Sequence, residues 1–444
     1  MRHRNAARLS AVLAALLAAT PAGAETLSRA EAVARALQVN PDVQKSIEEL
    51  HRLDGLITAA KADALPEITA YGTFTRFRDP SFLNSSSFDS FPPEFKEQLR
   101  PIPANIYEGT AQLKQTLFSF KLGHAIKAAR FGRAYGQEEV QRARQGVALI
   151  AIQVYNDYLL SLEKSRIAQK AVWQKEEQLE QAQNRRAAGV ATDLDVLRFH
   201  VNLENERANL LAVQGQTDLA RGRLNAVMVR PIDDAVTPSD ALDYIPFDVS
   251  IDDAVKEAWQ NRPEAKSVAL QEKIRRELVG VAQGDGRPTL DFVTSYGWSV
   301  RKPENFFESD FAKWDLGFSL KVPLFDGFRT AGKVTMARAE LNKVSQDLIA
   351  LENQIRLEAK GAVDRLRVAE KVLNAATLNV SQAQKALDMT QANYRLGAAN
   401  TLEVLDAQAA LTLAESNRSQ ALYVHANARA TLRWVMARDP LGTE

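Results

Sequence analysis

Residues 313–322 read KWDLGFSLKV, and apolar side chains occupy every second position of this stretch. A period of two is that of a β-strand with one apolar and one polar face. The strand is long enough to cross a bilayer when tilted, so the pattern predicts a wall that faces lipid on one side and water on the other. The pattern leaves one alternative open, a soluble β-sandwich in which one face of the sheet is exposed to solvent. The apolar positions are Trp314, Leu316, Phe318, Leu320 and Val322.

Three further stretches alternate in the same way, at residues 290–299, at 107–114 and, more weakly, at 68–75. With residues 313–322 they make four predicted strands in two pairs: 68–75 with 107–114, and 290–299 with 313–322. The link within the first pair, residues 78–103, contains five prolines and is longer than the link at 301–311. Long and variable links at one end of a strand set are typical of extracellular loops in outer-membrane barrels.

Two proline-free windows, residues 104–230 and 324–439, predict very long helices. The second window carries an apolar series in steps of three and four, with one extra step of four from Ile355 to Ala359. That extra step is a stutter, which locally unwinds a supercoil. A lone helix cannot bury such a stripe, so we expect neighbouring helices beside it. The series is Val344, Leu348, Leu351, Ile355, Ala359, Ala362, Leu366, Ala369, Leu373, Ala376, Val380, Ala383 and Leu387.

Each long helix is expected to end near Gly189 or Gly397, because glycine suits the left-handed conformation that ends many helices. Asp193 and Thr401 are the residues expected to cap the returning helices. Earlier in each half, a short helix ends at an Asn-Pro or Arg-Pro step. A second helix follows from about residue 43 to 63 and from about 265 to 281.

The chain is an internal duplication. At a shift of 222 residues, Pro41 falls on Pro263. Beyond the strands the shift becomes 207–208, so that Gly189 falls on Gly397. Paired prolines and glycines over such a distance indicate two copies of one structural unit. We predict a first repeat at residues 25–230, a linker at 231–249 and a second repeat at 250–444.

Residues 1–24 have the pattern of a signal peptide. Arg2, Arg4 and Arg8 precede an apolar run, and Ala22-Gly23-Ala24 gives a small-residue cleavage site. The mature chain is therefore expected to begin at Glu25 and to leave the cytoplasm. No other apolar run approaches the roughly 20 residues of a transmembrane helix, so none is expected.

Composition excludes several classes of function. Lys plus Arg number 56 against 55 Asp plus Glu, which gives no electrostatic footprint for nucleic acid. Cysteine is absent and the five histidines are scattered, so we expect no metal site, no cofactor and no catalytic constellation. Gly284-Asp285-Gly286 lacks the Lys-Ser/Thr of a phosphate-binding loop and is interpreted as a helix-to-strand junction.

These features resemble the TolC-type outer-membrane efflux proteins. The resemblance rests on Asn40-Pro41, on residues 117–118 (LF) and 324–327 (LFDG), and on residues 394–397 (YRLG) and 401–408 (TLEVLDAQ). It implies a mainly α fold with a β-barrel portion, built from duplicated halves of two strands and a long helical hairpin. A homotrimer would close a 12-stranded outer-membrane barrel, continued by an α-helical coiled-coil tunnel. The implied partners are outer-membrane lipid, a periplasmic adaptor protein and an inner-membrane pump.

The resemblance also assigns site residues around the second turn. Glu403 and Asp406 match acidic positions that face the tunnel near its periplasmic constriction, Leu402 matches an apolar constriction position, and Tyr394 helps to hold the closed state. Three copies of the two carboxylates would favour cations. The alternative is a solvated first helical turn that suits the helix dipole. The residues implied to contact the adaptor are Arg395, Leu396, Gly397, Ala188 and Gly189.

The function indicated is a passive outer-membrane duct with a gated periplasmic end, serving a tripartite efflux pump or a type I secretion system. Between these two systems the sequence does not decide. A non-conducting periplasmic coiled-coil scaffold is the first alternative, although it has no need of a lipid-facing strand at 313–322. A soluble periplasmic binding protein or enzyme is the second, and the absence of a nucleophile or metal motif argues against it.

Overall fold

The computed structural model describes residues 25–81, 92, 94 and 102–442. The predicted signal peptide at 1–24 and most of the proline-rich link at 78–103 lie outside these residues. The chain divides into two compact units. We call them the sheet unit, Glu49–Gly136 with Val268–Asp347, and the helical unit, which holds the remaining described residues. Each unit takes segments from both halves of the sequence.

The sheet unit contains one antiparallel sheet with the strand order β2-β3-β5-β6. Its strands are β2 (Glu67–Phe77), β3 (Ala104–Ser119), β5 (Thr289–Val300) and β6 (Ala312–Lys321). All four predicted strands are thus confirmed, although β3 extends well beyond the predicted 107–114. A bulge between Thr116 and Phe118 lets this strand continue without losing its pairing to β5.

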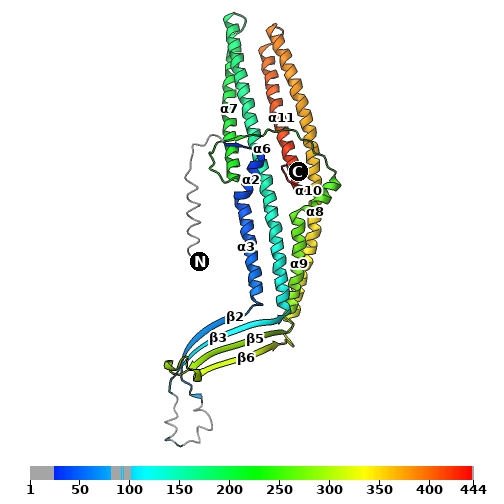
Figure 1. Cartoon of the computed structure of the whole chain (residues 1–444). Helices are drawn as coiled ribbons and strands as arrows, with labels where there is room; N and C mark the ends of the chain where they lie inside the picture. Colours follow the sequence, from blue (N-terminus) through cyan, green and yellow to red (C-terminus); the bar gives the residue numbers. More distant parts are fainter. Residues whose placement is uncertain (1–24, 82–91, 93, 95–101, 443–444) are drawn as a thin grey trace. The chain divides into compact units, whose positions relative to one another are not determined.

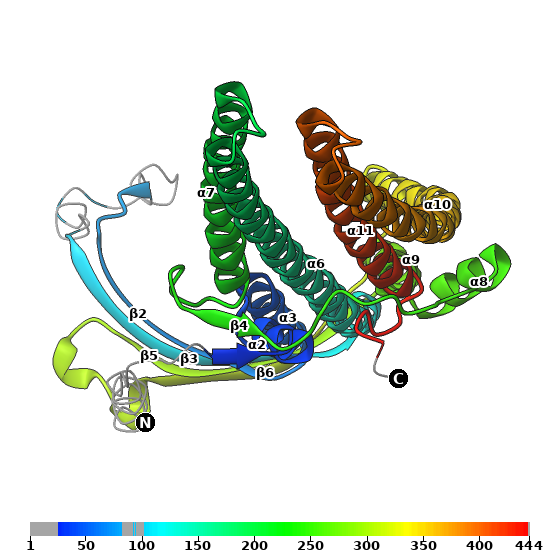
Figure 2. The same cartoon turned by 90° about the horizontal axis from the view of Figure 1, so that it is seen from above.

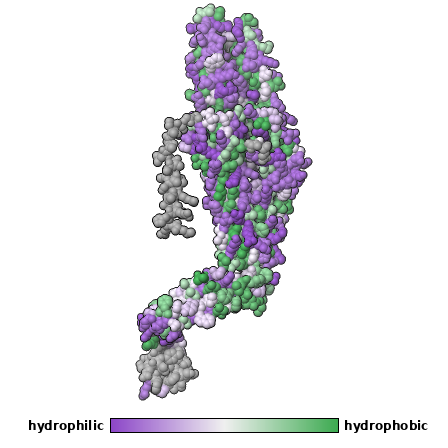
Figure 3. Space-filling view, viewed as in Figure 1, coloured by the Kyte–Doolittle hydropathy of each residue, from purple (hydrophilic) through white to green (hydrophobic). Residues whose placement is uncertain are grey.

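The two faces of the sheet differ as the alternation predicts. On one face Phe292 pairs with Phe318 and Tyr296 with Trp314, whose side chain is 74% exposed. On the other face Glu108 accepts hydrogen bonds from Ser299 at 2.9 Å, from Lys313 at 3.3 Å and from Thr73 at 3.3 Å. Polar groups thus satisfy one another across four strands. Most of the apolar face is exposed, and only at one end do Phe306 and Phe307 pack against Trp298. Figure 3 shows hydrophobic residues gathered where the strands of this unit meet its helices.

Each half begins with a pair of helices separated by a proline step. The pairs are α2 (Arg29–Val39) with α3 (Pro41–Ala62) and α8 (Ile251–Asn261) with α9 (Pro263–Gly284). Asn40 and Arg262 are extended, as the residue before a proline prefers to be. The second helices start at the prolines themselves, two residues before the predicted positions 43 and 265, because proline is well suited to the first helical position.

The long helices form two hairpins (Figures 1 and 2). α6 (Phe120–Ala187) returns as α7 (Asp193–Val227), and α10 (Arg329–Arg395) returns as α11 (Thr401–Val435). The predicted apolar series of α10 is buried or half-buried at every position from Val344 to Leu387. Since many of these residues are alanine, they permit close approach of the neighbouring helices. Element order repeats between the halves: two short helices, two strands, then a hairpin.

The segment between the halves is tied into the helical unit. β1 (Glu25–Leu27) pairs in parallel with β4 (Val236–Pro238), which lies within residues 231–249. Two tyrosines of α6 donate hydrogen bonds to this small sheet, Tyr155 to the carbonyl of Leu27 and Tyr158 to that of Val236, both at 2.8 Å. The segment that joins the two halves is therefore packed against the helical hairpins.

Candidate functional site

The hairpin turns are built on a shared backbone. Gly189 and Gly397 have φ angles of +74° and +76°, in the left-handed region that glycine tolerates best. The amide of Gly189 donates to the carbonyl of Arg186, and the amide of Val190 donates to that of Arg185, both at 2.9 Å. Gly397 and Ala398 repeat this arrangement, so both long helices end in a Schellman motif.

The returning helices begin with capping boxes, and the predicted caps are wrong by one residue. Thr192 and Asn400 are the N-caps, whereas Asp193 and Thr401 are the first helical residues. Sequence reasoning placed the caps late because it missed the reciprocal bond from the third helical residue. That residue is Glu403 in α11, whose amide donates to Asn400 Oδ1 at 3.0 Å while its carboxylate accepts from Asn400 Nδ2 at 2.9 Å.

The same arrangement at the first turn involves Asp195. Its carboxylate accepts from the Thr192 hydroxyl at 2.7 Å and from the Thr192 amide at 3.0 Å. These hydrogen bonds favour the charged form and hold the pKa of Asp195 below its usual value. The capping box of α7 therefore contains an ionised carboxylate near the positive end of the helix.

Three of the predicted gate residues lie on the exposed face of α11. Leu402, Glu403 and Asp406 are exposed, Leu402 at 57%, whereas Val404 and Gln408 point into the hairpin pair and are buried. Asp406 makes no hydrogen bond or ion pair to any residue that the structure describes. The structure thus separates the two carboxylates by role, because Glu403 is already part of a helix cap and Asp406 is not.

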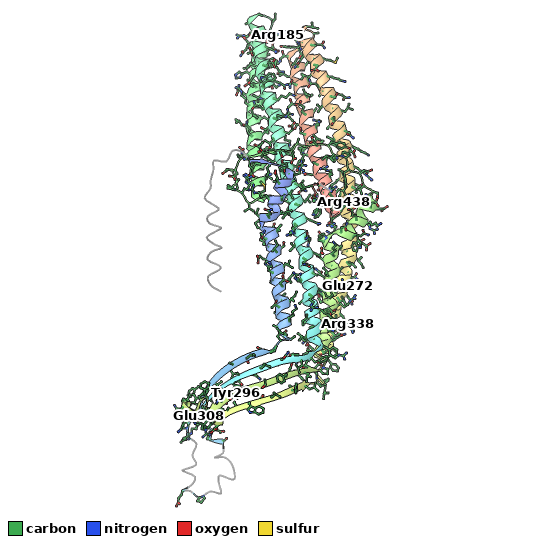
Figure 4. The ribbon with its side chains drawn as sticks, in the orientation of Figure 1. Arg185, Glu272, Tyr296, Glu308, Arg338 and Arg438 are labelled. Carbon is green, nitrogen blue, oxygen red and sulfur yellow. The ribbon has the colours of Figure 1, made fainter. Side chains whose placement is uncertain are left out.

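Tyr394, the fourth predicted gate residue, contacts the first hairpin. The guanidinium of Arg185 lies 4.4 Å from the centroid of the Tyr394 ring, and its Nη1 donates to the Tyr394 carbonyl at 3.4 Å. Figure 4 places Arg185 at the end of the α6–α7 hairpin. Close by, Thr401 donates to Asp195 Oδ1 at 3.3 Å. These contacts surround a cleft of about 430 Å³ that Leu402 also lines.

The hairpins are also joined further from the tips. Gln408 donates to Gln174 at 2.5 Å, and Lys170 pairs with Glu415 at 2.8 Å. Sequence reasoning missed every contact between the hairpins. One signal was present: Arg185-Arg186 departs from the Asn393-Tyr394 of the equivalent turn. That difference has a structural counterpart, since the arginine of one turn stacks on the tyrosine of the other.

The residues expected to contact an adaptor lie at the ends of the hairpins. Ala188, Gly189, Arg395, Leu396 and Gly397 are all exposed, with Leu396 at 83%. Val190, which sequence reasoning did not single out, exposes a further apolar side chain beside them. The ends therefore present small and apolar residues together with the exposed arginines Arg186 and Arg395.

No cluster of three or more histidine, cysteine, aspartate or glutamate residues suited to a metal occurs among the described residues. Within the same residues, no helix combines the length and apolar character that crossing a bilayer demands. Gly284-Asp285-Gly286 connects α9 to β5, which confirms the predicted helix-to-strand junction.

Comparison with known proteins identifies the fold. The family model described as "Outer membrane efflux protein" matches residues 32–228 and 254–438, one match in each half. The chain is 25% identical over 378 residues to outer membrane protein OprJ of Pseudomonas aeruginosa, covering 82% of this chain and 74% of OprJ. It is 23% identical over 409 residues to outer membrane protein TolC of Escherichia coli, covering 87% and 78%.

Among solved structures, the Campylobacter jejuni CmeC outer membrane channel superposes with a TM-score of 0.80 at 14% identity, covering 92% of this chain and 85% of that one. The predicted fold class, a helical tunnel with a barrel portion, is thereby confirmed. The predicted outer-membrane location and channel function agree with the same findings. The family model covers most of the chain, and the chain therefore belongs to the outer membrane efflux protein family.

Proposed function

We propose that three copies of this chain form one gated duct across the outer membrane. The observation that carries the trimer is the sheet itself, whose outer strands β2 and β6 have no partner on their free edges within the described chain. Unpaired edges are templates for further pairing, and four strands cannot close on themselves. Pairing β6 of one copy with β2 of the next gives a twelve-stranded barrel with the apolar face toward lipid and the Glu108 face toward water.

The gate is formed at the turns of α10 and α11 by Leu402, Glu403, Asp406 and Tyr394. Three of these residues are exposed on one face of α11. Around a threefold axis this face would bring carboxylates together, where they repel one another and attract cations. The Arg185–Tyr394 contact restrains the second hairpin, and it is weak enough to break when a partner binds.

The exposed tips are the docking surface for a periplasmic adaptor. Arg395, Leu396, Gly397, Ala188 and Gly189 supply a small, apolar and basic surface there. Conduction is passive, and the energy for transport comes from an inner-membrane pump coupled through the adaptor. The relatives are outer-membrane proteins, and we infer that this chain likewise has no catalytic activity and needs no cofactor.

The division into a signal peptide at 1–24, repeats at 25–230 and 250–444 and a linker at 231–249 stays a prediction. The two family matches support it, because each falls within one predicted repeat. Whether the duct serves an efflux pump or a type I secretion system is set by the pump, and the tips carry no residue that separates the two.

Single-channel conductance in a planar bilayer tests the gate. Asp406→Ala is expected to raise conductance and to lower cation selectivity, since it removes an exposed carboxylate that forms no hydrogen bond or ion pair with a described residue. Glu403→Gln should act in the same direction while preserving the capping box, because glutamine can still accept the Asn400 hydrogen bonds. Asp388→Ala removes an exposed carboxylate from α10 and is the matched control. Unchanged conductance and selectivity in both gate variants would refute the gate.

A further inference from the structure

Asp285 fixes three chain segments at the junction of strands and helices in the sheet unit. Its Oδ1 accepts from Lys121 at 2.9 Å, at the start of α6, and its Oδ2 accepts from Lys333 at 2.5 Å, near the start of α10. Gly284 brings the backbones into direct contact, since a Cβ there would lie 2.7 Å from the backbone of Lys121. The segments around residues 117–121, 284–287 and 321–333 therefore form one rigid surface.

That surface carries a collar of exposed apolar side chains. Leu324 is 93% exposed and Phe325 is 78% exposed. Phe325 and Phe328 meet edge to face at 5.7 Å between ring centroids, and Phe118 and Phe120 do so at 5.1 Å. Large apolar groups gathered in water are unfavourable unless they meet a membrane or a partner. The collar consists of Leu117, Phe118, Phe120, Val322, Leu324, Phe325 and Phe328.

The backbone holds the collar in place at some cost. Phe328 has a φ of +64°, a left-handed conformation that is unfavourable for any residue with a side chain. The preceding Gly327 has a φ of +66°. Asp326 anchors this turn by accepting a hydrogen bond from the amide of Thr330 at 2.8 Å. Strain of this kind indicates a functional demand on the position, here the exposure of an aromatic ring.

Basic side chains border the collar. Arg287 and Arg329 are exposed, and neither forms an ion pair with a described residue, although Arg329 interacts electrostatically with Asp326. The guanidinium of Arg287 lies 5.5 Å from the centroid of Phe120. Lys321 is also exposed, but it lies on the polar face of β6, together with Lys313, and not on the side of the collar. The acidic residues of the surface are already engaged, Asp285 by two lysines and Asp326 by the start of α10.

We infer that this surface binds the phosphate of an anionic phospholipid, in the membrane leaflet on the helical side of the sheet. The collar continues the lipid-facing side of β6, so its rings lie at the level of the headgroups, where aromatic residues are enriched. Arg287 and Arg329 then face the phosphates, as juxtamembrane basic residues do. A free phosphate ion would make no use of seven exposed apolar side chains. The inference rests on the proposed insertion of the sheet into the outer membrane.

Native mass spectrometry of the purified mature chain tests the inference. The protein in detergent is mixed with equal amounts of dioleoylphosphatidylglycerol and dioleoylphosphatidylethanolamine, and bound lipids are counted. We expect more phosphatidylglycerol adducts than phosphatidylethanolamine adducts. The double variant R287Q/R329Q should lose at least about fivefold in phosphatidylglycerol binding, the factor expected from one basic residue at an anionic surface.

The matched control removes two positive charges elsewhere. R275Q/R338Q changes exposed arginines on α9 and α10 away from the collar, with Arg338 marked in Figure 4. It should bind both lipids as the unmodified chain does. The variant F325A/F328A should lower the binding of both lipids equally, because it removes apolar contacts and leaves the charges.

Three results would overturn the inference: equal binding of the two lipids by the unmodified chain, an unchanged preference in R287Q/R329Q, or the same loss in the control. Measuring the conductance of the same preparations distinguishes a failure of the lipid site from a failure of the proposed duct. A conducting protein without lipid preference refutes the lipid site alone. A protein that prefers phosphatidylglycerol but does not conduct supports the lipid site and refutes the proposed duct.

Discussion

The two hairpin turns have the same backbone and different side chains. Both end a long helix with a glycine at a φ near +75°, and both start the returning helix with a capping box. At equivalent positions, however, the first turn has Arg186 where the second has Tyr394, and Asp193 where the second has Thr401. Asp193 is exposed, whereas Thr401 is buried against the first hairpin.

The difference shows how a duplicated element becomes a pair of complementary ones. Two identical turns would place like groups against each other. Here the cation of Arg185 meets the ring of Tyr394, and the acceptor Asp195 meets the hydroxyl of Thr401. The backbone of the repeat is therefore preserved where helix geometry demands it, and the side chains have diverged where the two copies touch.

The largest effect is expected from the shared backbone. Gly189→Val and Gly397→Val should each destabilise their turn by about 1–2 kcal/mol, because a side chain in the left-handed region clashes with its own backbone. Amide hydrogen exchange in the last turn of α6 or α10 should speed up by roughly 5- to 30-fold. An equal effect at both turns supports a common backbone requirement.

Gly215→Ala, inside α7 with open space around its Cα, is the control. It should be neutral or stabilising by up to about 1 kcal/mol, because alanine favours a helix over glycine. If valine were tolerated at one turn and not at the other, the two turns would not share their geometry in solution.

A smaller effect is expected where the turns differ. A double-mutant cycle of Arg185→Ala and Tyr394→Ala should give a coupling free energy of about 0.5–1 kcal/mol, the size of an exposed cation–π contact. Hydrogen exchange at the tips measures it. Conductance should rise in either single variant, because the restraint on the second hairpin is lost.

Arg186 and Asp193 form the control pair, since their ion pair stays within the first hairpin. Breaking it should leave conductance unchanged. If the Arg185–Tyr394 cycle showed no coupling, or if the control pair altered conductance equally, contact between the hairpins would not be what restrains the gate.

Much of this architecture is readable from local pattern. The alternation of apolar and polar residues predicted the strands, and the positions of two glycines predicted the helix ends. Both patterns depend only on residues that are close together in the chain. The start of α11 was misplaced by one residue, since Asn400 and Thr401 are both good caps and only the reciprocal bond from Glu403 separates them.

Contacts between the hairpins were beyond sequence reasoning. Arg185 and Tyr394 are far apart in the chain, and neither residue type specifies a distant partner. The lengths of helices α6 and α10 bring these two side chains to the same level, so their contact follows from tertiary packing alone. The candidate gate residues could be predicted only from the family resemblance. Residues that line a pore and residues that face bulk solvent are both exposed on a helix, and the local sequence does not distinguish them.

The smallest effect concerns pH and is confined to the first turn. Because its hydrogen bonds to Thr192 lower the pKa of Asp195, this carboxylate stabilises the α7 cap above the unfolded pKa of about 3.9. This stabilisation is lost as the pH falls from the unfolded pKa through the lower pKa of the folded state, so acid should loosen the first turn.

Pepsin cleavage tests this prediction. Cleavage near residues 188–195, normalised to cleavage elsewhere in the chain, should increase in the unmodified protein as the pH falls below about 3.9. Asp195→Asn retains a cap but cannot titrate, so its normalised cleavage should stay constant with pH. A parallel rise in both proteins would place the acid sensitivity elsewhere and remove Asp195 from the differences that set the two turns apart.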